Sequence, residues 1–500
     1  MSADLPPYEH FDLCVIGGGP SGYAAAMRAV DLGLRTLLVE RDKVGGAGIY
    51  NGALSSKTLW EMSQRVANAN DLVRKRDREP YRLSWEEINR TLNEAVFERK
   101  YLFSCHMQLL EKNSDCFRHA RGMARFTGPN TIRIDRGDRH LHITADHIVV
   151  ATGSRPRILP DMPVDEEVIL SSDGIFRMDE LPRSIVIVGA GVIGCEFATI
   201  LSNFGCTQVH LVDRAARILP FEDEDVSEVV ARSLERRGVI IHGSAKLESL
   251  KRIGSEAEFT LLQPDGTRHT ERVDRALISV GRIPCLDGLG LELTGIHQRT
   301  GTSQPELNGT ATSLSHIHVV GDATGSNMLV NLGEVAARHT VERIAGLTGP
   351  EPDTGHASTI MFLEPEVAGV GLNEQECRKQ GIPHRVARID YSCLARAIAM
   401  RRTKGFFKLL VTDDADMHVL GMRAVGEHAS SAIQAVALMM RMGTGVRELA
   451  DLIHPHPSIT EGVQECARLL LGTSLFKAPV FGDRMRCATW RPNTSEASAA

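Results

Sequence analysis

The sequence predicts an α/β protein with two Rossmann-like units in its first part and a separate region at its C-terminal end. Two observations predict this fold class. An apolar strand, a glycine-rich turn, a helix and a second strand follow one another at residues 11–40, and the same order recurs at residues 184–213. Polar turn residues at 350–355 then set the remaining chain apart.

Composition excludes several classes of protein. The chain has 500 residues, of which 42% are hydrophobic and 24% charged, the balance of a globular protein. The net charge of -6 gives no basic field for nucleic acid, and no apolar run approaches the roughly 20 residues that span a bilayer. The ten cysteines show no metal or redox spacing, and the N-terminus lacks a signal pattern. We therefore expect a soluble, cytoplasmic protein without a metal site or a membrane span.

The first glycine-rich turn has the residues that a dinucleotide needs. Gly17 permits the tight turn, Gly19 lets the backbone approach a pyrophosphate, and Gly22 lets the helix pack on the strand. Glu40 ends the second strand about 20 residues further on, where an acid accepts hydrogen bonds from ribose hydroxyls. The turn at residues 17–22 therefore predicts a dinucleotide site.

The second turn repeats this pattern with Gly189, Gly191 and Gly194. Asp213 holds the place of the ribose-binding acid, which favours NAD. Arg214 and Arg217 follow closely and are able to meet a 2′-phosphate, so NADP stays open. Between the two units lies a charged helical stretch at residues 65–112.

Five motifs in order resemble one enzyme family. They are the two glycine turns, Ala151-Thr152-Gly153 after a strand, Gly281-Arg282-Ile283-Pro284, and Gly321-Asp322. Together they resemble the FAD-dependent pyridine nucleotide–disulfide oxidoreductases, which include dihydrolipoamide dehydrogenase and the soluble pyridine nucleotide transhydrogenase. The resemblance runs from about residue 10 to 475.

The resemblance implies two Rossmann-like domains, for FAD and NAD(P), and an α+β dimerisation domain in a homodimer. It places the FAD-binding domain at residues 1–155 and 281–350, the NAD(P)-binding domain at 156–280 and the dimerisation domain at 351–477. The rest, residues 478–500, is rich in Ser, Arg and Pro and is expected to be a flexible tail. The FAD-binding residues that the resemblance implies are Gly17, Gly19, Gly22, Glu40, Gly46, Lys57, Thr152, Gly153, Asp322, Met328 and Leu329. The implied NAD(P)-binding residues are Gly189, Gly191, Gly194, Glu196, Asp213 and Gly281.

The redox motif departs from the family pattern. The family has Gly-Gly-x-Cys-x-x-x-x-Cys-x-x-Ser-Lys, and residues 45–57 keep this frame but have Gly48 and Ala53 at the two cysteine positions. Dithiol chemistry needs a thiolate, which neither residue supplies. Disulfide reduction by the family route is therefore excluded unless a distant thiol, such as Cys487 in the tail, substitutes.

Two other family features are retained. Lys57 and Glu196 resemble the pair that lies beside flavin N5, where a positive charge stabilises reduced flavin. His456 and Glu461 resemble the acid–base pair that acts across the dimer interface, and the alternative is a structural remnant that caps a helix.

Without the two cysteines, electrons from the reduced FAD are expected to pass to an acceptor that is not a disulfide. We expect an NAD(P)H oxidoreductase of the diaphorase or quinone reductase type, since a quinone needs the acid that His456 offers. A soluble NAD(P) transhydrogenase is a close alternative, supported by residues 405–410 and 426–429, and oxygen is a third acceptor. A non-catalytic flavoprotein subunit is a further alternative, but it would not need Lys57 and Glu196.

Overall fold

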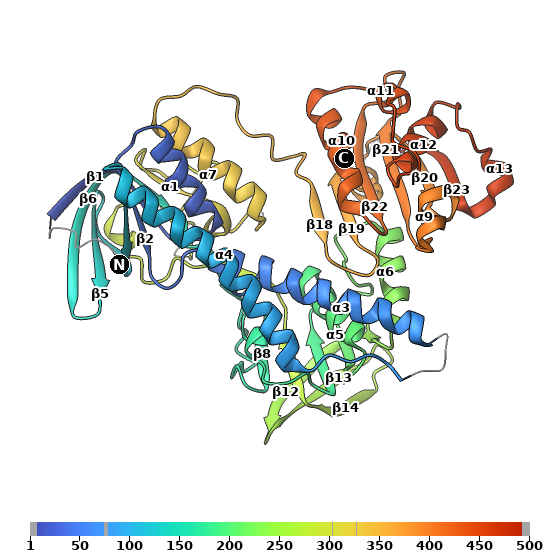
Figure 1. Cartoon of the computed structure of the whole chain (residues 1–500), viewed down its shortest axis with the longest axis horizontal. Helices are drawn as coiled ribbons and strands as arrows, with labels where there is room; N and C mark the ends of the chain where they lie inside the picture. The colour runs from blue at the N-terminus through green and yellow to red at the C-terminus, as the bar shows by residue number, and fades with distance from the viewer. Residues whose placement is uncertain (1–7, 75–78, 303, 327, 493–500) are drawn as a thin grey trace.

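The computed structural model describes residues 8–74, 79–302, 304–326 and 328–492. Three regions, each built on its own sheet, follow one another along the chain (Figure 1). In Figure 1 the first lies at the left, the second at the bottom and the C-terminal region at the upper right.

The first region holds a seven-stranded sheet in the order β3-β2-β1-β6-β5-β4, with β17 also paired to β6. Along β1, Leu13 and Val15 pack against helices, whereas Cys14 and Ile16 face the opposite cluster, as the two-residue period of a strand requires. The strands are β1 (Tyr8–Ile16), β2 (Thr36–Glu40), β3 (Phe117–Arg121), β4 (Met123–Gly128), β5 (Thr131–Arg136), β6 (Arg139–Val150) and β17 (Ile317–Val319). Helices α1 (Pro20–Asp31) and α7 (Val330–Ile344) pack side by side on one face (Figure 1).

The second region has a parallel sheet in the order β11-β10-β9-β15-β8. Its strands are β8 (Ile169–Ser171), β9 (Ser184–Val188), β10 (Gln208–Val212), β11 (Ile240–His242) and β15 (Arg275–Ile278). Ile185 and Ile187 pack with α5 (Val192–Phe204) and α6 (Glu224–Arg236), and Val186 and Val188 pack under an antiparallel meander. The meander consists of β12 (Lys246–Ile253), β13 (Glu256–Leu262) and β14 (Arg268–Val273). Strands β7 (Ser154–Pro156) and β16 (Arg282–Pro284) pair with each other, one before and one after the second region in the chain.

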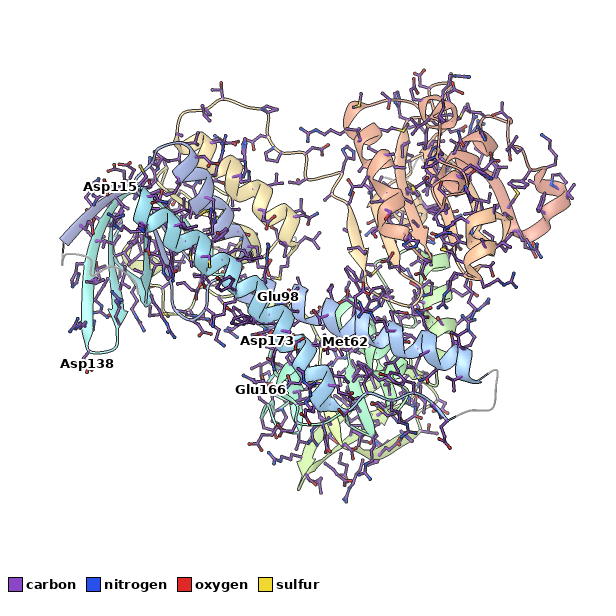
Figure 2. All side chains as sticks on the ribbon, viewed as in Figure 1. Met62, Glu98, Asp115, Asp138, Glu166 and Asp173 are labelled. Carbon is purple, nitrogen blue, oxygen red and sulfur yellow. The ribbon has the colours of Figure 1, made fainter. Side chains whose placement is uncertain are left out.

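One long helix runs from the first region to the second, and another lies along the second region (Figure 1). They are α4 (Trp85–Asn113) and α3 (Ala53–Arg74), so the charged helical stretch expected at residues 65–112 is divided between two helices. Ser84 starts α4 with a capping box, in which its hydroxyl accepts from the backbone N–H of Glu87 and the Glu87 carboxylate accepts from the backbone of Ser84. Figure 2 shows that Asp115 lies just beyond the end of α4, at the outer edge of the first region.

The C-terminal region is an antiparallel sheet in the order β18-β19-β22-β21-β20-β23, covered by short helices. The strands are β18 (Thr359–Met361), β19 (Val367–Gly371), β20 (His384–Asp390), β21 (Phe406–Thr412), β22 (Val419–Val425) and β23 (Met485–Trp490). The helices are α8 (Glu374–Lys379), α9 (Ala395–Met400), α10 (Ala429–Met442), α11 (Val446–Asp451), α12 (Glu461–Leu470) and α13 (Ala478–Phe481).

The prediction of a flexible tail from residue 478 is wrong up to residue 492. β23 pairs along the whole of its length with β20 and forms the edge of the sheet, and Met485 is buried in the core. Arg486 pairs with Glu374, and the Trp490 ring stacks on His384. These contacts outweigh the polar composition on which the prediction rested. Residues 493–500 lie outside the described residues.

A buried ionic cluster joins the second region to the C-terminal region. Lys408 on β21 is 1% exposed, and its Nζ lies 2.8 Å from Asp223 Oδ1 and 3.1 Å from Asp225 Oδ2. Glu374 completes the set. Burial alone would lower the pKa of Lys408, but these carboxylates raise it above its ordinary value. The ammonium group also accounts for the gathering of three acids at this point.

Among the residues that the structure describes, no helix combines the length and the apolar character of a membrane span.

Candidate functional site

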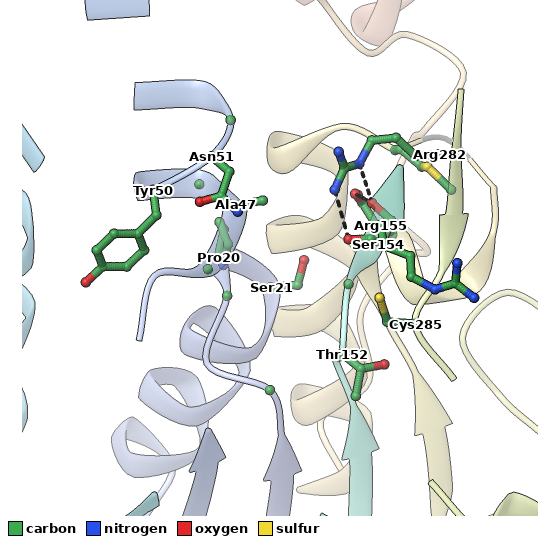
Figure 3. Close-up of a pocket in the computed structure, with 18 of the residues that line it drawn as sticks. Pro20, Ser21, Ala47, Tyr50, Asn51, Thr152, Ser154, Arg155, Arg282 and Cys285 are labelled. Atoms are coloured by element: carbon green, nitrogen blue, oxygen red, sulfur yellow. Dashed lines mark hydrogen bonds between the residues drawn. The ribbon is translucent and has the colours of Figure 1, made fainter. Parts of the chain in front are cut away.

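A cavity of about 550 Å³ lies where the carboxyl end of the first sheet meets α2 (Gly46–Ile49), α3 and α5. Open parallel sheets bind their ligands at this edge. Figure 3 shows Pro20, Ala47, Tyr50 and Asn51 on one side, and Ser154, Arg155, Arg282 and Cys285 on the opposite side. The lining includes eleven predicted site residues: Gly17, Gly19, Glu40, Gly46, Lys57, Thr152, Gly153, Glu196, Asp322, Met328 and Leu329.

Two glycines of the first turn, Gly17 and Gly22, have no room for a side chain. Gly17 has a φ of +106°, and a Cβ there would lie 2.3 Å from the carbonyl oxygen of Ala151. A Cβ at Gly22 would lie 1.8 Å from the carbonyl oxygen of Gly17, so Gly22 sets helix packing and does not line the cavity. The turn therefore brings the N-terminus of α1 to the cavity, where free backbone N–H groups attract an anion.

Glu40 and Asp213 are held in the same way at the two glycine turns. Glu40 Oε2 accepts from the backbone N–H of Gly18 at 2.7 Å, and its Oε1 accepts from Asp42 at 2.8 Å. Asp213 Oδ2 accepts from Ala190 at 2.6 Å, and its Oδ1 accepts from Ala215 at 2.8 Å. Each carboxylate is thus fixed at the end of its second strand.

The glycines of the second turn lie outside the 550 Å³ cavity, whereas Val192, Ile193, Glu196 and Phe197 of α5 line it. Gly191 precedes α5 as its N-cap, and a Cβ at Gly194 would lie 1.9 Å from the carbonyl oxygen of Gly189. Gly281 has a φ of +103°, a backbone conformation that favours glycine. The predicted residues Gly189, Gly191, Gly194, Asp213 and Gly281 therefore form a separate end of the site.

The two arginines that left NADP open differ in the structure. The guanidinium of Arg217 donates to the carbonyl oxygen of Glu222 at 2.8 Å and to Ser227 Oγ at 2.6 Å, and it also bonds carbonyl oxygens at residues 219 and 220. These bonds commit Arg217 to the loop. Arg214 is exposed.

Lys57 and Glu196 form an ion pair at the cavity. Lys57 Nζ lies 2.9 and 3.1 Å from the two carboxylate oxygens of Glu196, although the two residues are far apart in sequence. The Glu196 side chain is 8% exposed and that of Lys57 31% exposed. The backbone N–H of Phe362 donates to Glu196 Oε1 at 3.0 Å, and Lys57 Nζ lies 4.8 Å from the centre of the Phe362 ring. Sequence reasoning missed Phe362, because a backbone donor has no signal in the sequence.

The segment that carries the altered redox motif lies against the first glycine turn. Gly48 and Ala53 both line the cavity. A Cβ at Gly48 would lie 2.6 Å from Pro20 Cγ, whereas Ala53 is exposed. Position 48 therefore has no room for any side chain without movement of the backbone or the proline ring.

One cysteine, Cys285, belongs to the described cavity lining. Burial raises the pKa of its thiol. Cys487 lies on strand β23 and pairs with Ala387 of strand β20. Burial raises the pKa of the Cys487 thiol as well. A higher thiol pKa leaves less thiolate for attack on a disulfide.

Two further groups contribute polar contacts to the cavity. Ser154 Oγ donates to Asp322 Oδ2 at 2.7 Å. The Arg282 guanidinium donates to Ser154 (Figure 3) and to Asp173. The hydroxyl oxygen of Thr152 is buried and has no partner among the described residues. Arg282 was not among the predicted residues, although it directly follows Gly281 in the motif that the sequence displayed.

His456 and Glu461 lie together on the surface of the C-terminal region. His456 Nδ1 is 2.8 Å from Glu461 Oε1, and the backbone N–H of Ser458 donates to Glu461 Oε2 at 2.8 Å. Burial would raise the pKa of Glu461, but the bonds from His456 and Ser458 lower it below its ordinary value. The His456 side chain is 72% exposed, and neither residue lines the cavity of its own chain.

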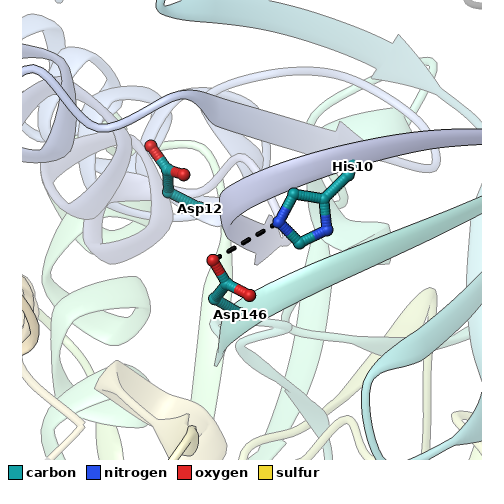
Figure 4. Close-up of side chains that lie close together, drawn as sticks. All are labelled: His10, Asp12 and Asp146. Carbon is teal, nitrogen blue, oxygen red and sulfur yellow. Dashed lines mark hydrogen bonds and ion pairs between the residues drawn. The ribbon is translucent and has the colours of Figure 1, made fainter.

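A second group of polar side chains lies at the opposite end of the first sheet (Figure 4). His10 and Asp12 on β1 face Asp146 on β6, with His10 Nε2 3.3 Å from Asp146 Oδ2. His10 Nδ1 lies 3.0 Å from Thr144 Oγ1, and Asp12 accepts from the backbone N–H of Arg35 at 2.7 Å. These bonds between neighbouring strands account for the group.

Known proteins match almost the whole chain. A family model described as pyridine nucleotide-disulphide oxidoreductase matches residues 11–340, and the dimerisation domain of the same family matches residues 357–467. The dihydrolipoyl dehydrogenase of Bacillus subtilis is 32% identical over 474 residues, which cover 91% of this chain and 97% of the relative. Dihydrolipoyl dehydrogenase 3 of Pseudomonas aeruginosa is 32% identical over 478 residues, which cover 93% of this chain and 99% of the relative.

The chain belongs to the pyridine nucleotide-disulphide oxidoreductase family. Its cofactors are accordingly FAD and NAD(P)H, and the matched dimerisation domain supports a homodimer. The crowded glycine turn and the unpartnered Thr152 hydroxyl beside it fit the binding of FAD in the 550 Å³ cavity.

Solved structures agree with the α/β fold. LpdA from Mycobacterium tuberculosis is 26% identical with a TM-score of 0.83, and the match covers 92% of this chain and 99% of that one. The flavoprotein disulfide reductase RclA from Escherichia coli is 24% identical with a TM-score of 0.82, and the match covers 92% of this chain and 100% of that one, which shows the fold alone.

Proposed function

We propose that this protein oxidises NADH through FAD and passes the electrons to a non-disulfide acceptor, with a quinone as the preferred class. One observation carries the proposal. The cavity keeps the Lys57–Glu196 ion pair, but its described lining contains one cysteine where dithiol chemistry needs two.

The loss of the dithiol rests on positions 48 and 53. In the family frame these positions hold the cysteines, and here they hold Gly48 and Ala53. The contact between a Cβ at Gly48 and Pro20 supports a local backbone adapted to glycine. Cys285 has no second thiol beside it in the lining, and Cys487 is engaged in a strand, so neither supplies the missing pair.

The role we assign to Lys57 is electrostatic. FAD accepts two electrons from a reduced nicotinamide, and a fixed positive charge nearby favours its reduced form. Glu196 holds the Lys57 ammonium with two hydrogen bonds and is itself fixed by the backbone of Phe362. A protein that only bound FAD would not need this arrangement, which counts against a non-catalytic subunit.

A preference for NADH over NADPH follows from the second turn. Asp213 is held as Glu40 is, so its carboxylate faces the place of a ribose, where it would repel a 2′-phosphate. Arg217 donates its hydrogen bonds to its own loop. Of the two arginines, exposed Arg214 is therefore the one available for a contact with phosphate.

His456 is the proposed proton donor to the acceptor. Its Nδ1 is fixed by Glu461, which leaves Nε2 free to face a ligand. The pair lies on the C-terminal region and outside the cavity of its own chain, so in the homodimer it would serve the partner's site. A quinone needs two protons with its two electrons, whereas a nicotinamide needs none from the protein.

An acceptor panel tests the proposal. The FAD-loaded protein is assayed with NADH or NADPH, each with menadione, thio-NAD, lipoamide or oxygen. We expect rapid turnover with NADH and menadione and none with lipoamide. The variant His456→Ala should slow menadione reduction and spare thio-NAD reduction. Fast lipoamide turnover would refute the loss of the dithiol, and thio-NAD as the fastest acceptor would favour transhydrogenation.

A further inference from the structure

A second cavity, of about 880 Å³, lies between the second region and the C-terminal region. Its walls come from the later turns of α3, the C-terminal ends of α5 and α6, and the loop at residues 401–404 that precedes β21. It shares no lining residue with the 550 Å³ cavity. Nothing in the proposed NADH oxidation uses it.

Basic side chains gather in this cavity without partners. Arg236 at the end of α6 and both Arg401 and Lys404 in the loop line the cavity. None of these three side chains takes part in an ion pair or side-chain hydrogen bond among the described residues. Unpaired cations from two regions of the chain therefore face one space.

The lining also holds acidic residues, namely Glu61, Asp71, Glu364, Glu366 and Glu427. Glu364 lies 3.8 Å from Arg237, and Asp71 lies 4.0 Å from Arg402. Burial raises the pKa of Glu366, and the neighbouring Glu427 raises it further.

The charges around Lys404 shift its pKa. Burial lowers the pKa of Lys404, and the positive charges of Arg236 and Arg237 lower it further. The opposing effects of Glu364 and Asp71 are smaller. An anion placed between Lys404 and Arg236 would relieve the repulsion between these two cations.

We propose that this cavity binds a ligand with a multiply charged phosphate group, held by Arg236 from α6 and Lys404 from the loop. Arginine matches phosphate oxygens with its planar fork, and lysine adds a point charge. The ligand would join the second region to the C-terminal region at a point distinct from both glycine turns.

Calorimetric titration with inorganic pyrophosphate tests the site. The FAD-loaded homodimer is used with saturating NAD⁺, so that the pyrophosphate places of the two dinucleotide turns are filled. We expect one pyrophosphate per chain, and affinity weakened about tenfold or more in Arg236→Ser and in Lys404→Ser, as the loss of a charge-assisted bond implies. Citrate should bind much more weakly, since it lacks phosphate.

The matched control is Arg232→Ser, one turn earlier on the same helix. Arg232 pairs with Glu228 and does not line the cavity, so its loss changes the net charge equally and should leave affinity within twofold. Flavin absorbance and elution volume confirm that each variant is folded and dimeric. Absent binding, equal weakening in Arg232→Ser, or equal affinity for citrate would overturn the proposal.

Discussion

The ion pair between Lys57 and Glu196 gives the most specific prediction about the chemistry. Glu196→Gln keeps the size of the side chain and an oxygen that still accepts from the backbone N–H of Phe362. It removes the negative charge and one of the two oxygens that hold the Lys57 ammonium at 2.9 and 3.1 Å. We expect NADH to reduce the flavin more slowly in this variant, because the lysine charge loses its fixed position.

The magnitude follows from burial. Breaking a fully buried ion pair costs about 3–5 kcal/mol, and charge-assisted hydrogen bonds contribute about 1.5–3 kcal/mol. Glu196 is 8% exposed but Lys57 is 31% exposed, so water replaces part of the loss and the lower range applies. Each 1.36 kcal/mol is a tenfold change in rate, so about 1.5–3 kcal/mol predicts a roughly 10- to 150-fold decrease.

The assay is anaerobic stopped-flow bleaching of the flavin by NADH. The variants Glu196→Gln, Lys57→Met and their combination form a double-mutant cycle, in which the pair should be non-additive. A matched control is Glu222→Gln, which removes a buried carboxylate paired with Arg423 away from the cavity. It should lower thermal stability and leave the bleaching rate unchanged. A change below twofold in Glu196→Gln, or additive effects in the cycle, would refute the reasoning.

Three further predictions concern stability and specificity. Gly48→Ala should lower the free energy of unfolding by roughly 1–3 kcal/mol, because the new Cβ would lie 2.6 Å from Pro20 Cγ and overpack the site. The control Ala53→Ser should leave stability unchanged. Equal melting temperatures for the two variants would contradict this. In steady-state kinetics, Asp213→Asn should raise the KM for NADH about tenfold and leave kcat unchanged. An unchanged KM would argue against a contact between Asp213 and the ribose. Burial lowers the pKa of His318 to about 4 from 6.5, so the unfolded chain binds its proton first and the free energy of unfolding should fall as the pH drops from 6.5 toward 4. Urea titrations should show a flatter pH dependence in His318→Asn, and an unchanged slope would contradict this.

The sequence predicted those parts of the fold that depend on local pattern. Each glycine turn has its strand before it and its helix after it, because the turn, the apolar run and the closing acid are contiguous in the chain. The resemblance also placed Lys57 and Glu196 in contact, which spacing alone could not do. Their meeting depends on the packing of α3 against α5.

What the sequence did not predict depends on contacts between distant segments. The tail looked polar and irregular, but Arg486 and Met485 find partners on β20 and α8 that no local pattern displays. The break between α3 and α4 was hidden in a continuous run of charges, although Ser84 and Glu87 form a capping box. The crowding of Gly48 by Pro20 required the placement of two loops.

An anaerobic titration of the FAD-loaded protein with NADH tests the central claim most directly. FAD takes up two electrons and a redox disulfide takes up two more, so the end point counts the redox groups. We predict that one NADH per FAD completes the reduction, because Gly48 and Ala53 leave no disulfide beside the flavin. An end point of two NADH per FAD would reveal a second two-electron group and contradict the account.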